Sequence, residues 1–191
     1  MTRFVRLGLL AAMQFAILAA MIATYAYDMK RGREIVVRTE PVDPRALFRG
    51  HYVRLGYPMS AIDIALLDAG CIDSGAPVFV TLRQTGPMAW EPVAAAPAMP
   101  EDGFADDRVT LRGRVTSTPN CTERTGSFFV DYGISAYFAS PEMARELENR
   151  MRGVDREPER LPVILSVPPT GRALIKGIVL DGTRIPDNDI F

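Results

Sequence analysis

The sequence has little of the side-chain chemistry on which most enzyme sites depend. Its 191 residues contain one histidine, His51, and two cysteines, Cys71 and Cys121. A metal site built from several histidines is therefore excluded within one chain, and two cysteines in unrelated loops do not make a zinc site. A lone histidine at a strand entrance more often caps a turn or packs on an aromatic ring than acts as a base. No glycine-rich phosphate-binding loop is present, and we expect neither a metal nor a cofactor.

An excess of charge of one sign is missing as well. The chain has 22 basic and 23 acidic residues, and its formal net charge is -1. Binding to nucleic acid normally requires a basic patch with aromatic residues or a known motif, and the sequence shows neither. We therefore expect no nucleic-acid partner.

The sequence does have one long apolar run without charge, from Leu7 to Tyr27. This run is close to the ~20 residues that a bilayer-spanning helix needs. Two arginines, Arg3 and Arg6, precede it, and Tyr25 near its end is typical of aromatic residues at a membrane–water interface. A cleaved signal peptide is the alternative, but its apolar core usually has only ~7–15 residues. We therefore predict an uncleaved anchor that contacts the lipid bilayer.

The length of the chain allows this anchor and a single domain with a real core, but hardly two domains. We predict a transmembrane anchor in residues 1–30 and one β-rich domain in residues 31–191. Cationic residues flank the apolar run on both sides, since Lys30, Arg31 and Arg33 follow it. The positive-inside rule therefore leaves the orientation open.

The two cysteines bear on the compartment. Cys71 and Cys121 both lie downstream of the anchor, each beside turn-forming residues. A disulfide between them would stabilise the fold by about 4 kcal/mol through restriction of the unfolded chain, and the alternative is two thiols that never meet. Such a bridge persists only in an oxidising compartment. Pairing would favour a domain on the outer face of a bacterial-type inner membrane.

Beyond the anchor, short β-type segments alternate with turn signals, which is typical of a small, mostly antiparallel barrel or sandwich. Residues 60–67 fit a strand or a short helix equally well, and residues 94–103 are typical of a flexible alanine- and proline-rich loop. One helix is expected from Pro141 to Met151, with Ser140 as its N-cap. Strands are expected over residues 33–38, 51–57, 78–84, 88–93, 108–116, 127–138, 162–167 and 173–180. Gly133 is expected to form a bulge or kink in the 127–138 run. The predicted fold class is thus mainly β with one short helix, behind a single N-terminal transmembrane helix.

The segment from residue 40 to residue 60 is dense enough to be called a motif. Asp43 and Pro44 are typical of the N-cap and first position of a short helical turn, and Gly50 can end that turn in a left-handed conformation. The side chains then alternate, which predicts a half-buried strand. One face of this strand carries Val53, Leu55 and Tyr57, and the wetter face carries Tyr52 and Arg54.

This segment resembles the signature of the GDYXXLXY family, which is named for its motif Gly-Asp-Tyr-x-x-Leu-x-Tyr. The matching residues are Asp43, Pro44, Gly50, Tyr52, Leu55 and Tyr57, and His51 stands where the family has aspartate. A second, weaker similarity includes Tyr132, Gly133 and Tyr137, with Ser135 in place of a glutamate. The resemblance implies a membrane-anchored, extracytoplasmic protein, and the family has no established biochemical activity to carry over.

Three functions are compatible with these features. We favour a non-catalytic interaction or accessory protein of the bacterial cell envelope that binds another membrane or envelope protein through Tyr52 and Arg54, because tyrosine offers apolar area with a polar tip. The first alternative is an envelope hydrolase with either a carboxylate site or a serine–lysine site, in which Lys176 would activate Ser60 or Ser166. The second is a sensor that binds a small ligand in the pocket of a barrel.

Overall fold

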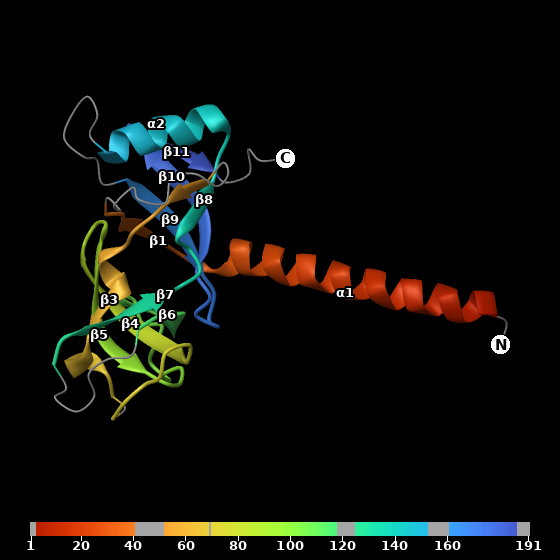
Figure 1. The fold of residues 1–191 in the computed structure, drawn as a ribbon, viewed down its shortest axis with the longest axis horizontal. Coiled ribbons are helices and arrows are strands. Elements are labelled where there is room, and N and C mark those ends of the chain that lie inside the picture. Colours follow the sequence, from red (N-terminus) through yellow and green to blue (C-terminus); the bar gives the residue numbers. More distant parts are fainter. Residues whose placement is uncertain (1–2, 41–51, 69, 118–124, 153–160, 187–191) are drawn as a thin grey trace.

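A computed structural model describes residues 3–40, 52–68, 70–117, 125–152 and 161–186. A long N-terminal helix projects from a set of antiparallel sheets with one further α-helix, called the body below (Figure 1). The predicted mainly-β class is confirmed. The predicted architecture is a small barrel or sandwich. Within the described ranges no sheet closes on itself, so a barrel is not observed, and the sandwich stays a prediction.

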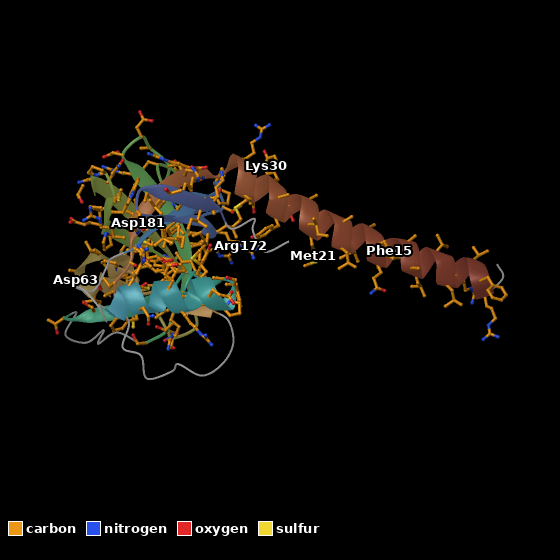
Figure 2. The ribbon with its side chains drawn as sticks, turned by 90° about the horizontal axis from the view of Figure 1, so that it is seen from above. Phe15, Met21, Lys30, Asp63, Arg172 and Asp181 are labelled. Carbon is orange, nitrogen blue, oxygen red and sulfur yellow. The ribbon has the colours of Figure 1, made fainter. Side chains whose placement is uncertain are left out.

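Helix α1 (Arg3–Arg31) contains the predicted apolar run and is long and apolar enough to cross a bilayer. None of its residues is buried against the body, and Figure 2 shows Phe15 and Met21 far from it. A helix that is apolar all round needs an apolar environment, and the body does not provide one. A membrane span and a signal sequence both meet this description.

The first sheet is antiparallel. It brings the strand that follows α1 together with the last three strands of the chain that the structure describes. Its strand order is β1-β9-β10-β11. The four strands are β1 (Arg33–Arg38), β9 (Pro162–Val167), β10 (Leu174–Leu180) and β11 (Thr183–Pro186). Asp181 and Gly182, with φ of 49° and 77°, form the two-residue turn that the Asp-Gly pair predicts.

The second sheet has five strands in the order β3-β7-β6-β4-β5. They are β3 (Ala61–Asp63), β4 (Pro77–Gly86), β5 (Ala89–Ala96), β6 (Arg108–Val115) and β7 (Ser127–Asp131). The prediction of a loop from residue 94 is wrong at its start, because Ala94–Ala96 belongs to β5, where Ala95 pairs with Val80 and is fully buried. Alanine has a low strand propensity, and pairing with β4 overrides it.

A two-stranded ribbon completes the body. In this ribbon β2 (Tyr52–Arg54) pairs with β8 (Ala136–Phe138). The β-type run over residues 127–138 is two strands in two sheets, and Gly133, the expected kink, adopts a φ of +74° between them. The sequence of residues 60–67 is compatible with a strand or a short helix, and the structure contains both. The strand β3 is followed by the 3-10 turn η2 (Ile64–Leu66). Another 3-10 turn, η1 (Pro58–Ser60), precedes β3.

Helix α2 (Pro141–Arg152) begins as predicted, with the Ser140 hydroxyl accepting a hydrogen bond of 3.3 Å from the amide of Met143. Its buried face, with Leu147 at its centre, joins the same hydrophobic core as the three sheets. Phe128, Met59 and Leu165 are among the large side chains buried in that core. A single core therefore holds the ribbon, the two larger sheets and α2 together.

Candidate functional site

The two segments that carry the signature residues pack against each other. Val53 of β2 lies opposite Tyr137 of β8 in the ribbon, and both are buried. Just beyond the ribbon, the amide of Leu55 donates a hydrogen bond of 2.9 Å to the carbonyl of Ser135. The first and second signature segments, far apart in the sequence, therefore form one local structure.

Two buried tyrosines connect these segments in both directions. The hydroxyl of Tyr57, from the first segment, donates to the carbonyl of Ile134 at 3.0 Å. The hydroxyl of Tyr132, from the second segment, donates to the carbonyl of Met59 at 2.8 Å. Burial raises the pKa of both phenols well above the ordinary value of 10. Both therefore remain neutral hydrogen-bond donors, which is a structural role.

Gly133 and Asp131 set the bend that makes this arrangement possible. The positive φ of Gly133 favours glycine, and its amide donates to the Asp131 carboxylate at 2.8 Å. Tyr137, two residues into the returning ribbon, is 5% exposed. The described signature residues thus act mainly in architecture, and they do not line an open reactive site.

Four signature residues, Asp43, Pro44, Gly50 and His51, lie outside the described residues. Tyr52 is described only through its backbone, which pairs with Phe138. Cys121 also lies outside the described residues, so its predicted pairing with Cys71 stays a prediction.

The side of the ribbon opposite the core is a candidate contact surface. Arg54 is exposed there, and Phe138 keeps 62% of its surface exposed, while Val53 and Tyr137 point into the core. Arg54 lies opposite Ala136, and residue 52 lies opposite Phe138. We call Arg54, Phe138 and position 52 the ribbon face. The sequence analysis missed Phe138, which alternation from the buried Tyr137 would have revealed.

The residues of the hydrolase hypothesis have other partners in the structure. Ser166 is fully buried, and its hydroxyl donates to the carbonyls of Asp28 and Met29 at 2.9 and 3.1 Å. Lys176 forms an ion pair with Glu34. Ser60 is held in η1, where its amide donates to the carbonyl of Tyr57. Among the described residues no serine–lysine hydrogen bond joins these groups.

Glu34 is the centre of a small charge cluster on the first sheet. Arg184, with nitrogen–oxygen distances of 3.0 and 3.1 Å, and Lys176 both donate to its carboxylate. These hydrogen bonds, that of Arg184 first, lower the pKa of Glu34 from 4.5 to about 2. The cluster joins β1, β10 and β11 across the sheet.

This cluster predicts a specific acid dependence. Because the pKa of Glu34 is depressed in the folded state, its stabilisation is complete above about pH 4.5 and is lost as the pH falls toward about 2. The side chain is 40% exposed, so screening limits the contribution to about 1 kcal/mol. We expect Glu34→Gln to lower the free energy of unfolding by that amount at pH 7 and to flatten its loss in acid. Urea titrations followed by Trp90 fluorescence measure both quantities.

The control is Glu91→Gln, which removes an exposed carboxylate from β5. It should leave the acid dependence of the wild type unchanged. An identical loss of stability between pH 5 and pH 2 in wild type and Glu34→Gln would show that the cluster does not stabilise the fold.

The fold and the ribbon define a class of protein. In this class an N-terminal helix able to span a membrane precedes a body of β-sheets, and two tyrosine-bearing segments of the body pack against each other. The family model of the GDYXXLXY protein matches residues 14–178, which cover most of the chain. The chain belongs to this family, as the resemblance indicated. No curated protein and no solved structure matches the chain.

Proposed function

We propose that this chain is a non-catalytic, single-pass membrane protein of the bacterial cell envelope that binds another membrane or envelope protein through the ribbon face. One observation carries the proposal. The signature folds two distant segments into a ribbon whose inner face is buried, while Phe138 and Arg54 stay exposed on the outer face. Aromatic residues and arginine are enriched at the centres of protein interfaces.

The experiment compares two exposed phenylalanines, Phe138 on β8 and Phe129 on β7, which are consecutive strands of different sheets. We expect Arg54→Ala combined with Phe138→Ala to reduce the recovery of a crosslinked partner at least tenfold, because aromatic and arginine anchors each contribute about 2 kcal/mol or more to an interface. Crosslinking in cells from a photoreactive residue at position 52, followed by mass spectrometry, identifies the partner. Phe129→Ala on β7, where the side chain is 54% exposed, is the matched control and should retain it.

Two results would contradict this proposal. One is undiminished crosslinking in the Arg54 and Phe138 double variant. The other is an equal loss of phenotype in Ser60→Ala or Lys176→Ala at unchanged stability, which would favour the hydrolase.

We further propose that the body lies on the extracytoplasmic side and that Cys71 pairs with Cys121. Support comes from the apolar α1 near the N-terminus and from the lack of a free cysteine among the described residues. Alkaline phosphatase fused to the C-terminus should be active, since that enzyme needs an oxidising compartment. An inactive fusion with a folded, full-length chain would place the body in the cytosol and remove the basis for the pairing.

A further inference from the structure

The junction between α1 and the body contains almost no linker. Gly32 is the single residue between α1 and β1, and its amide donates to the carbonyl of Asp28 at 3.0 Å. A Cβ at Gly32 would lie 2.2 Å from the Ser166 hydroxyl oxygen, which itself caps the carbonyls of Asp28 and Met29. The last turn of α1 is therefore fixed to β9, and the body has a defined position relative to the helix axis.

The length of α1 places the body at the surface of the bilayer. Its 29 residues span about 43 Å at 1.5 Å per residue, and a bilayer with its headgroups is about 40–45 Å thick. The apolar run to Tyr27 fills the hydrocarbon layer, so the last turn of α1 lies among the headgroups. Without a linker, the adjacent end of the body meets the same layer.

The strand register shows which loop lies at that end. Arg33, the first residue of β1, lies opposite Val167, the last residue of β9. The connection from β9 to β10 therefore leaves the sheet at the end where α1 enters, and Figure 1 shows this connection beside the C-terminal end of α1, where the helix joins the body. Arg172 in this connection is exposed, and Figure 2 shows it on the side of the body from which α1 projects.

Three exposed cations lie at this end of the body. Lys30, Arg31 and Arg172 are exposed, and within the described residues none of them forms an ion pair with a carboxylate. Arg33 is also cationic, and it donates to the carbonyls of Ala105, Asp106 and Arg108. The opposing carboxylates here are Asp28 and those of the acidic 101–107 segment that Arg33 contacts. Within that segment Asp102 and Asp107 pair with Arg108, and Glu34 is already paired with two cations.

We propose that Arg172, together with Lys30 and Arg31, binds the phosphate groups of anionic phospholipids, so that the body rests on the headgroup layer. The inference depends on the proposed membrane span of α1. A cation beside an anionic membrane surface contributes about 1 kcal/mol. Lys30 and Arg31 would meet lipid wherever the body lay, since they belong to α1. Arg172, 140 or so positions further along the chain, meets it only if the body is seated on the bilayer.

The test measures the association of spin-labelled phosphatidylglycerol and phosphatidylcholine with the full chain reconstituted in mixed vesicles. We expect the wild type to prefer phosphatidylglycerol and Arg172→Gln to reduce this preference about two- to fivefold, which corresponds to the loss of up to about 1 kcal/mol. Arg38→Gln is the matched control, because Arg38 is exposed at the opposite end of β1. It should retain the wild-type preference, and circular dichroism should show equal thermal stability in all variants.

Three other results would each contradict a different part of the inference. If Lys30→Gln reduces the preference and Arg172→Gln does not, the helix alone contacts anionic lipid and the body stands clear of it. If Arg38→Gln has the same effect as Arg172→Gln, the preference reflects net charge and not a seated surface. If the wild type immobilises neither lipid, α1 does not span the bilayer, and the proposed function fails with the inference.

Discussion

Replacement of Tyr132 by alanine is expected to lower the free energy of unfolding by about 3–5 kcal/mol, as for other large buried aromatic side chains. The side chain is 6% exposed, and its hydroxyl serves the buried carbonyl of Met59. Alanine removes both the ring and the hydrogen bond that ties the second signature segment to the first. Urea unfolding of the full chain in detergent, followed by the fluorescence of Trp90, measures the change, since Trp90 is the single tryptophan.

Tyr132→Phe separates the ring from the hydroxyl. It keeps the apolar volume but leaves the carbonyl of Met59 without this donor, so a loss of about 1–3 kcal/mol is expected. A stability equal to that of the wild type would show that the buried hydroxyl does not join the two segments.

The second large effect concerns two adjacent residues of one type on β7. Phe128 is fully buried and Phe129 is 54% exposed. Phe128→Ala is expected to cost about 3–5 kcal/mol through lost burial and the cavity that remains. Phe129→Ala should cost less than about 1 kcal/mol, because most of its ring already faces water. The same urea titration measures both variants.

This pair tests the register of β7 directly. Strand side chains alternate between faces, so a shift of one residue would exchange the roles of the two rings. A larger loss for Phe129→Ala than for Phe128→Ala would contradict the pairing of Phe128 with Ile62 and of Phe129 with Ala61. It would also disqualify Phe129 as the control for the ribbon face.

Alternation and turn chemistry predicted the parts of the fold that depend on neighbouring residues. The β-branched run Ile35–Val37 is confirmed as β1, and Ser140 with Pro141 is confirmed as the start of α2. The Asp181–Gly182 turn is confirmed in the same way. Each of these signals lies within a few residues and acts through the local backbone.

Contacts between residues far apart in the sequence could not be predicted from alternation and turn chemistry. Tyr57 and Tyr132 donate to backbone carbonyls, and a carbonyl carries no side-chain signal in the sequence. Ser166 looked like a candidate nucleophile because its partners, Asp28 and Met29, lie 138 and 137 positions away. Phe138 was missed because its exposure depends on which face of β8 the core covers, and that face is set by the burial of Tyr137.

The pairing of β1 with β9 has a consequence for synthesis. The strand that follows α1 pairs with a strand almost at the other end of the polypeptide, so a ribosome must make most of the protein before Ile35 and Val37 can be covered. Until then a short β-branched strand edge stays unpaired next to α1, and such an exposed edge favours misassembly. Because β9 is translated late, the junction between α1 and β1 is one of the last parts of the body to complete its sheet.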